Sequence, residues 1–316
     1  MERLAILKIH IQYEIHIFIL WFAMNLHHLR IFLVVAETGS ISAGAERLHI
    51  SQPAVTREIR ELEESLGQRL FDRQPRGVRL TESGQRLLHY AQRIFNLEQA
   101  AERDLSDFAQ LEQGELRLGA SATLGAYLLP PLIGRFRQRH PQVFVSLAMD
   151  NTTGVTRQLD DGLISLGLVE GPFARDAYAH RLLAQDPLLP VVAAHHPLAA
   201  AKRLPASSLQ DYPLYLREPG SGTRNSIEQA YRSHGLEPRA HMAIGSTEAL
   251  KRLLLDGQGI AWLSGHALER ELSSGELRQL AVFDLRIERD FHVLWRQGVS
   301  LSPAPSAFLA LNGISP

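Results

Sequence analysis

The sequence contains no cysteine among its 316 residues. Disulfide bonds, thiolate zinc sites and redox sensing through a thiol pair are therefore excluded. An excess of one charge is also lacking, because 33 lysines and arginines stand against 34 aspartates and glutamates and the formal net charge is −1. A prediction of nucleic-acid binding must therefore rest on where the arginines lie, since the total charge gives it no support.

Motifs of the common enzyme classes are missing as well. The sequence has no HExxH, no Walker A and no GxGxxG, and the GSG around Ser221 lacks the GxSxG spacing of a nucleophile elbow. His195 and His196 precede Pro197 and are expected in an exposed turn rather than in a metal site. We therefore predict no catalytic residue, no metal site and no cofactor, and an enzyme is the less favoured class.

The first 23 residues differ from the rest, because isoleucines alternate there with charged and polar residues. Their uninterrupted apolar part, residues 17–24, is far shorter than the ~20 residues that span a bilayer. Glu14 and His16 interrupt the apolar region and no small-residue cleavage site follows, so neither a secretory signal nor a membrane partner is predicted. We expect an upstream start codon, with Met24 as the natural beginning; an added strand or a packing arm is the alternative.

Residues 40–67 carry two helical patterns joined by a tight turn. Ser40 is expected to cap the first helix and Ser51 the second, with Pro53 near its start. An ordinary amphipathic helix pair is the alternative, but an outward face of hydrogen-bond donors on an apolar back is what a helix-turn-helix needs to read DNA. The apolar stripe consists of Val55, Ile59, Leu62 and Leu66, and the outward face of Gln52, Thr56, Arg57 and Arg60.

Two strand-like runs, residues 70–73 and 77–81, follow around a Gln-Pro-Arg-Gly turn. They predict a wing, whose arginines at 69, 73, 76 and 79 place positive charge where DNA phosphates would lie. The predicted DNA-binding residues are Ser51, Gln52, Pro53, Thr56, Arg57 and Arg60 of the helix and Arg73 and Arg76 of the wing.

Leu26 to Thr81 resembles the winged helix-turn-helix of LysR-type transcriptional regulators. The run FLVVAETGSISAGAERLHISQPAVTREIRELEESLGQRLFDR and the later VRLTESG follow that signature nearly position for position. Gly44 stands where the family usually has Ala, so we expect a helix looser by about 1 kcal/mol, and Glu58 stands where Gln is common, which should shift base preference. The resemblance implies a sequence-specific transcription regulator, located in the cytoplasm on the nucleoid, with double-stranded DNA and RNA polymerase as partners.

A long helix is predicted from a Thr81 cap to about Gln110. Its apolar residues recur every seven positions, which is typical of a helix–helix seam and here favours a dimer contact. Glu98 interrupts the seam, so it should be short, and a helix lying on its own domain is the alternative. The seam residues are Leu87, Ala91, Ile94, Ala101, Leu105 and Phe108.

After residue 114 strands alternate with helices, which predicts a parallel α/β sheet and two similar lobes. This resembles the family's effector-binding domain, a two-lobed fold like periplasmic binding proteins; a free-standing solute-binding protein would need a signal peptide and would carry no helix-turn-helix. The predicted organisation is an extension at 1–23, a winged helix-turn-helix (all-α with a small β wing) at 24–82, a linker and dimerisation helix at 83–113, and an effector-binding domain at 114–316, with lobe I at 114–184 and 283–316 and lobe II at 185–282.

Three turns that lead from a strand into a helix, at 119–125, 217–224 and 245–251, carry hydroxyls, glycines or arginines. Ligands of open α/β sheets lie at strand ends beside helix N-termini, so convergence of these turns on one cleft would hold a small anion. N-capping and turn glycines are the alternative. The candidate effector-binding residues are Ser121, Thr123, Asn151, Thr152, Glu170, Arg217, Gly220, Ser221, Gly222, Thr223, Arg224, Ser246 and Thr247.

Four segments narrow the resemblance to one branch of the family: ASATLGAYLLP at 120–130, Asn-Thr at 151–152, LGLVEGP at 166–172 and REPGSGTR at 217–224. That branch includes regulators of carbon fixation and of sulfite or cysteine metabolism. The resemblance implies a small anionic effector, either an inorganic sulfur oxyanion or a phosphorylated metabolite, and self-association into a homodimer or a homotetramer. Because the effector would touch both lobes, we expect it to alter DNA bending or footprint length more than affinity for one half-site.

Overall fold

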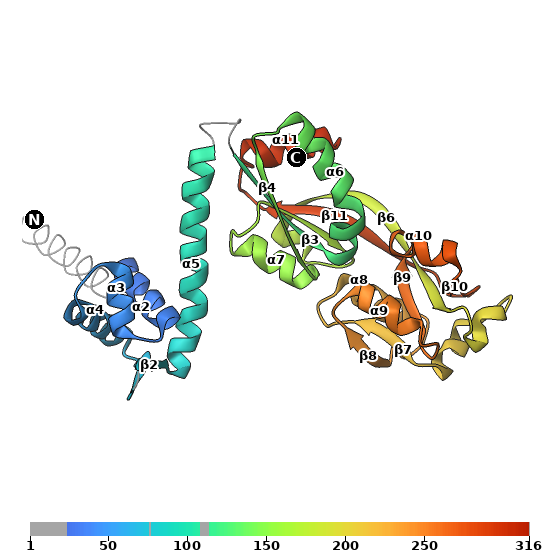
Figure 1. Cartoon of the computed structure of the whole chain (residues 1–316), viewed down its shortest axis with the longest axis horizontal. Coiled ribbons are helices and arrows are strands. Elements are labelled where there is room, and N and C mark those ends of the chain that lie inside the picture. The colour runs from blue at the N-terminus through green and yellow to red at the C-terminus, as the bar shows by residue number, and fades with distance from the viewer. Residues whose placement is uncertain (1–23, 76, 108–113, 316) are drawn as a thin grey trace, which may run out of the picture. The chain divides into compact units, whose positions relative to one another are not determined.

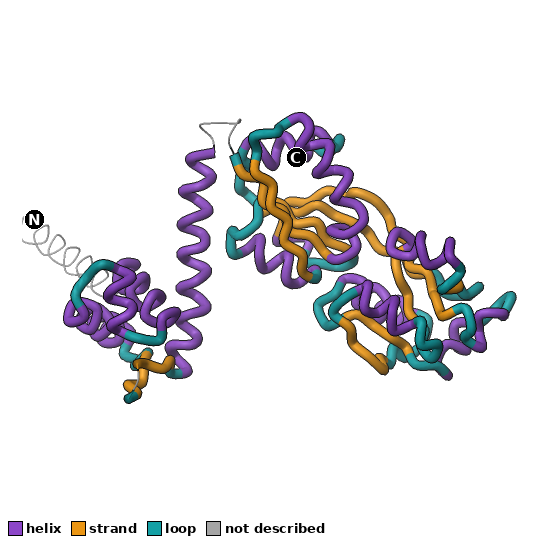
Figure 2. Tube along the Cα trace, viewed as in Figure 1, coloured by secondary structure: helices purple, strands orange, loops and turns teal. Residues whose placement is uncertain are grey.

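A computed structural model of the chain describes residues 24–75, 77–107 and 114–315. The chain divides after Gln99 into two compact units, one mainly helical and one with helices around β-sheets (Figures 1 and 2). The N-terminal extension, the predicted wing residue Arg76 and the last seam residue Phe108 lie outside the described residues. No helix in the described part of the chain is long and apolar enough to cross a membrane.

The first unit is built as its caps and apolar spacing predict. Ser40 Oγ accepts from the backbone N–H of Ala43 and Ser51 Oγ from that of Ala54, both at 3.4 Å, so each serine caps a helix. His49 makes the turn between these helices in the left-handed region, with φ of 55°. The elements are α2 (Leu26–Thr38), α3 (Ile41–Leu48), α4 (Gln52–Leu66), β1 (Phe71–Gln74), β2 (Gly77–Leu80) and α5 (Glu82–Asp107).

Close packing of α2, α3 and α4 forms the core of this unit. Val55, Ile59 and Leu62 of α4 are buried, whereas Leu66 is 38% exposed because α4 ends there, before Gly67. The predicted buried position of Leu66 is therefore wrong. A Cβ on Gly44 would lie 2.7 Å from Cγ2 of the fully buried Val35, so the glycine that lowers helix propensity also lets α3 approach α2.

Helix α5 begins at the predicted cap, because the N–H of Gly84 donates to Thr81 Oγ1 at 3.0 Å. Its first half packs on its own unit: Ala91 is fully buried, and Leu87 and Ile94 contact the same core. For these three residues the alternative of a helix lying on its own domain is correct, since a heptad period does not reveal which surface an apolar stripe contacts. Leu105, further along, is 75% exposed.

The second unit contains a sheet with strand order β10-β6-β11-β5-β3-β4, on which β9 pairs with β6, and a separate parallel pair, β7 with β8. The predicted parallel pairing is confirmed for β3, β4 and β5 in the large sheet and for β7 with β8, and it is wrong for the other strands. The other strands of this sheet, β6, β9, β10 and β11, pair antiparallel, and β6 and β11 are long strands that connect the lobes rather than strands of βαβ units. The strands are β3 (Glu115–Ser121), β4 (Phe144–Asp150), β5 (Leu166–Glu170), β6 (Tyr178–Ala193), β7 (Leu214–Arg217), β8 (Ala240–Ile244), β9 (Ala261–Ser264), β10 (Leu277–Gln279) and β11 (Ile287–Arg296).

Helices cover both faces of the parallel strands (Figure 1). Phe136 of α6 and Phe308 of α11 share one core with Leu116 and Leu118 of β3, whereas α7 contributes to a second core beyond the sheet. Neither α7 nor α10 was predicted. The helical elements are η1 (Leu124–Leu128, a π-helix), α6 (Leu129–Arg139), α7 (Thr152–Asp160), η2 (Arg175–Ala177), η3 (Pro197–Ala200), η4 (Ala206–Asp211), α8 (Gly222–Ser233), α9 (Thr247–Leu254), α10 (Gly265–Ser274) and α11 (Pro303–Leu311).

Strands β6 and β11 pass from one lobe to the other. Phe291 and Val293 of β11 lie in the core with β3, while Ile287 at its start lies in the core of the other lobe beside Trp262. Leu188 and Val192 of β6 belong to the same core as Trp262. The two crossover strands therefore bring residues of both lobes to one place, where the candidate site lies.

Candidate nucleic-acid interface and inter-lobe site

The outward side of α4 forms one surface. Five of its predicted DNA-binding residues line a single open hollow of about 450 Å³, and we call this surface the α4 face. Val55 and Ile59, buried on the other side of the helix, hold the face outward. Ser51 precedes it as the helix cap. The residues of the α4 face are Gln52, Pro53, Thr56, Arg57 and Arg60.

Acidic neighbours hold both arginines of the α4 face. Arg57 Nη2 donates to Glu58 Oε1 at 3.0 Å, and Arg60 Nε donates to Glu64 Oε1 at 2.7 Å. The hydrogen bond to Glu58 raises the pKa of Arg57 and lowers that of Glu58, and the bond to Glu64 raises the pKa of Arg60. A DNA acceptor must therefore compete with a carboxylate for each guanidinium.

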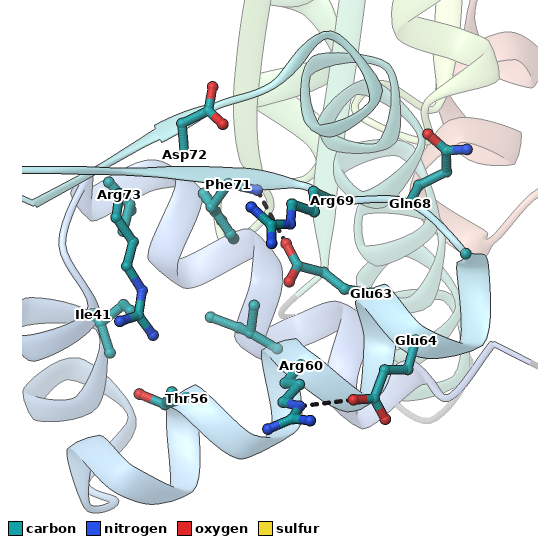
Figure 3. Close-up of a pocket in the computed structure, with 13 residues that line it drawn as sticks. Ile41, Thr56, Arg60, Glu63, Glu64, Gln68, Arg69, Phe71, Asp72 and Arg73 are labelled. Atoms are coloured by element: carbon teal, nitrogen blue, oxygen red, sulfur yellow. Dashed lines mark hydrogen bonds and ion pairs between the residues drawn. The ribbon is translucent and has the colours of Figure 1, made fainter.

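A groove of about 920 Å³ separates α4 from the wing (Figure 3). Arg73 extends from β1 into this groove on the side where Thr56 lies, and Arg69 and Arg60 line it as well. Glu63 Oε1 accepts from the backbone N–H groups of Leu70 at 2.7 Å and Phe71 at 3.2 Å. That carboxylate ties the start of the wing to α4, which fixes the spacing between the α4 face and the arginines of the wing.

A buried charge network lies where the lobes meet, and its centre, Arg289 of β11, is a residue that sequence reasoning missed. Arg289 donates through Nε to Asp186 Oδ2 at 2.8 Å, through Nη1 to Thr223 Oγ1 at 2.6 Å and through Nη2 to Thr123 Oγ1 at 3.1 Å. Its Nη1 also lies 3.0 Å from Glu170 Oε1. We call these five side chains the Arg289 network; it holds one cation and two carboxylates.

The network brings together three predicted residues from separate segments. Thr123 follows β3, Glu170 ends β5 and Thr223 opens α8; Thr223 Oγ1 also donates to Glu170 Oε1 at 2.9 Å. Ser121 Oγ and Glu170 Oε2, both buried, have no hydrogen-bond partner in the described part of the chain. Buried polar atoms without partners are rare in folded proteins, and here they mark unused hydrogen-bonding capacity beside the network.

Other predicted effector-binding residues have structural partners inside the fold. Ser221, Ser246 and Asn151 cap helices α8, α9 and α7, as the capping alternative predicts. Arg217 is buried and donates to Thr247 Oγ1 at 2.8 Å and to Glu218 Oε2 at 2.9 Å. Arg224 Nε donates to Glu228 Oε1 at 2.7 Å.

Glycine permits a close approach between the lobes. A Cβ on Gly222 would lie 1.6 Å from the carbonyl oxygen of Glu170, and Thr152 Oγ1 donates to that same oxygen at 2.9 Å. Gly220, with φ of 88°, accepts through its carbonyl from the N–H of Thr153 at 3.3 Å. At both glycines the backbone of one lobe therefore lies against the backbone of the other.

A second inter-lobe contact joins η1 to α9. The hydroxyl of Tyr127 donates to Glu248, and Lys251 Nζ lies 3.5 Å from the Tyr127 oxygen and 2.9 Å from Glu271 Oε1. Burial and the bond to Glu248 raise the pKa of Tyr127 to about 12, so the hydroxyl stays protonated and remains a donor at neutral pH. No spacing in the sequence predicted these partners.

The predicted exposed turn at His195 and His196 is correct only for the first of them. His196 is buried, its Nδ1 accepts from the N–H of Leu198 at 3.1 Å, and its ring lies 4.9 Å from that of Tyr212. The imidazole therefore caps η3. Burial lowers its pKa.

Comparison with known proteins bears on both units. Residues 26–85 match the family model of bacterial regulatory helix-turn-helix proteins of the lysR family, and residues 109–312 match the LysR substrate binding domain. The chain is 37% identical over 282 residues to the HTH-type transcriptional regulator CfxR of Cupriavidus necator, with 89% of each chain covered. It is 32% identical over 285 residues to the RuBisCO operon transcriptional regulator of Allochromatium vinosum, with 90% of this chain and 94% of that one covered.

The second unit is similar to a solved regulatory domain. The CcmR regulatory domain of Synechocystis PCC6803 in complex with 2-PG superposes with a TM-score of 0.59 at 30% sequence identity. The match covers 64% of this chain and 97% of that domain.

Proposed function

The chain belongs to the LysR family of transcriptional regulators, and from this premise we propose that a small phosphorylated anion, bound between its two lobes, controls how it holds DNA. It is a DNA-binding transcription regulator with an effector-binding domain. The residues, the effector and the mechanism proposed below extend that function.

On the DNA side, we assign base reading to Gln52, Thr56 and Arg57 of the α4 face, with Ser51, Pro53 and Arg60 beside them. Major-groove base edges offer acceptors that match an amide and a guanidinium. Arg73 and Arg76 of the wing contact the phosphate backbone or the minor groove. The common hollow formed by five of these side chains supports the assignment.

Self-association brings a second helix-turn-helix to the second half-site of the DNA. A single helix-turn-helix reads one half-site, so a homodimer, alone or paired into a homotetramer, fits the proposed function. The exposed Leu105 of α5 is a candidate seam contact. RNA polymerase is a further proposed partner, and the proposed location is the cytoplasm, on the nucleoid.

On the effector side, one observation carries the proposal: the hydroxyls of Thr123 and Thr223, from two different lobes, both accept hydrogen bonds from the same buried guanidinium of Arg289. A phosphate or carboxylate placed there would accept hydrogen bonds from hydroxyls and from Arg289. The unpartnered Ser121 hydroxyl adds a further donor. The remaining candidate residues, Asn151, Thr152, Arg217, Gly220, Ser221, Gly222, Arg224, Ser246 and Thr247, shape the walls of this site.

Competition with Glu170 couples anion binding to the lobe contact. Glu170 Oε1 already accepts from Thr223 and pairs with Arg289, so an incoming anion must displace this carboxylate or share its donors. Displacement changes a contact between β5 and α8, which belong to different lobes. A ligand shifts such an equilibrium only by its difference in affinity for the two arrangements, and couplings of about 1–3 kcal/mol are typical.

A phosphorylated metabolite is favoured over a sulfur oxyanion because the similar CcmR domain was solved with 2-PG. Genes of carbon fixation are the proposed targets, since a similar relative is named a RuBisCO operon regulator. The relatives considered are named as transcriptional regulators, and we assign no catalytic role to any residue of the site.

The test uses the full-length protein and calorimetric titration with 2-phosphoglycolate, inorganic phosphate, sulfate and sulfite. We expect 2-phosphoglycolate to bind most tightly and to raise the melting temperature, because a ligand of the native state alone stabilises it. Thr223→Ala should weaken binding and leave effector-free DNA binding intact, while Thr156→Ala, which replaces a half-buried threonine bonded only within α7, should change neither. Footprints on the protein's own selected DNA should change in length with effector; tight binding without any change would refute the mechanism.

A further inference from the structure

Three side chains with metal-ligating atoms converge where α2 packs against α4 in the first unit. His28 Nε2 lies 2.8 Å from Glu58 Oε2 and 3.5 Å from Glu61 Oε2, and one ligand atom from each residue lies within 4.8 Å of the others. The neighbouring Leu29 and Leu62 are fully buried in one core, so the two helices hold this arrangement rigidly.

The separations suit a small divalent cation. Zinc binds imidazole nitrogen and carboxylate oxygen at about 2.0–2.2 Å, which places tetrahedral ligand atoms about 3.3 Å apart. The two separations from His28 Nε2, 2.8 and 3.5 Å, lie on either side of that value, and the glutamate oxygens lie within 4.8 Å of each other. One imidazole and two carboxylates form a mixed donor set that suits zinc and its first-row neighbours, with a fourth position open to water.

The same two carboxylates hold Arg57 of the α4 face. Arg57 Nη2 lies 3.0 Å from Glu58 Oε1, and Arg57 Nε lies 3.7 Å from Glu61 Oε1. Each carboxylate thus presents one oxygen to His28 and the other to Arg57. A cation on the His28 side would neutralise part of the negative charge that the two carboxylates present to the guanidinium of Arg57.

We propose that His28, Glu58 and Glu61 form a binding site for a divalent transition-metal ion of the zinc class, and that metal binding there strengthens DNA binding by releasing Arg57. Two effects act in the same direction: the carboxylates compete less for Arg57, and positive charge is added close to the DNA phosphates. The DNA effect rests on the proposed reading role of Arg57, whereas the metal site does not.

The metal site is tested with full-length protein freed of metal and titrated with Co²⁺, whose visible absorption reports tetrahedral ligation, and then with Zn²⁺ in competition. We expect one strongly bound ion per chain in this site, with His28→Gln and Glu61→Gln weakening it by at least ~10-fold. His27→Gln, which removes the exposed neighbouring imidazole, is the matched control and should bind as the unchanged protein does.

Thermal melts in EDTA check that the variants fold. Glu61 is 48% exposed, so its substitution tests the site even if His28→Gln does not fold. Equal Co²⁺ binding by Glu61→Gln and the unchanged protein would overturn the site and leave a simple hydrogen bond between His28 and Glu58.

The DNA effect is tested by fluorescence anisotropy, using a duplex that the metal-free protein selects from a randomised library. Zn²⁺ should tighten binding by roughly 3- to 10-fold relative to EDTA, and Arg57→Ala should lose most of this gain. Zinc bound at His28 without any change in affinity would overturn the release of Arg57. If Arg57→Ala bound DNA as tightly as the unchanged protein when Zn²⁺ is present, the reading role would be wrong, while the Co²⁺ spectrum would still decide the metal site.

Discussion

Arg289 Nη1 lies 2.6 Å from Thr223 Oγ1, a hydrogen bond that joins crossover strand β11 to the first turn of α8. The Thr223 hydroxyl donates a hydrogen bond to Glu170 of the other lobe, and Arg289 also donates to Thr123. Buried carboxylates that lose their cation are left as uncompensated charges, which is strongly destabilising. The arrangement of the lobes therefore depends on one guanidinium.

Loss of Arg289 should destabilise the fold strongly. Arg289→Ala would leave Asp186 and Glu170 buried without their cation, so we expect the free energy of unfolding to fall by about 3–5 kcal/mol. Arg286→Ala removes an exposed arginine from the same segment and should change it by less than about 0.5 kcal/mol. Urea denaturation of the two variants measures the difference; similar losses would contradict the network's role.

Adding one methyl group at Gly222 should disturb the contact between the lobes. A Cβ at Gly222 would lie 1.6 Å from the Glu170 carbonyl oxygen, so Gly222→Ala should lower the unfolding free energy by at least about 1–3 kcal/mol. Gly245→Ala is the matched control, because no atom lies within 4 Å of its Cβ position. Denaturation curves compare them, and a harmless Gly222→Ala would show that the lobes separate without cost.

Substitutions on α4 and on the wing should weaken DNA binding in different ways. Gln52→Ala should relax the preference at one base position by about 1–3 kcal/mol. Arg73→Ala should weaken binding to all sequences alike and reduce the slope of log affinity against log salt concentration by about 1. Affinities for selected and scrambled duplexes at several salt concentrations measure both. Equal loss on every sequence for both variants would mean that these roles are wrongly assigned.

Stability should depend on pH through His292. Burial, and next the charge of Arg175, lower the pKa of His292 below its ordinary value of 6.5. As the pH falls, this imidazole is therefore protonated in the unfolded chain before it is protonated in the folded one. Stability rises with pH wherever the unfolded state binds more protons. The contribution of His292 is thus complete above about pH 6.5 and is lost as the pH falls from there towards the lowered pKa.

The measurement is urea denaturation at several pH values between about 5 and 8, the range in which histidines titrate. His292→Asn should reduce the slope of the unfolding free energy against pH. Part of it should remain, because burial also lowers the pKa of His196. An unchanged slope in the double variant, with His196→Gln added, would exclude both imidazoles as its source.

The sequence by itself determined the elements whose causes are local. Ser40 and Ser51 cap helices a few residues away, and the stripe of Val55, Ile59 and Leu62 faces the core because apolar residues three or four apart share one side of a helix. Where spacing along the chain decides the geometry, the prediction holds.

Only the tertiary structure decided which distant groups meet. Arg289 is 66 residues from Thr223 and 166 from Thr123, and no period or motif relates them. The seam of α5 shows the same limit, since a heptad repeat specifies an apolar face and leaves its partner open. Serines that cap helices and serines that could hold an anion have the same local sequence, because both lie at helix N-termini. Contacts between segments far apart in sequence depend on how β6 and β11 cross between the lobes, and that crossing exists only in the folded chain.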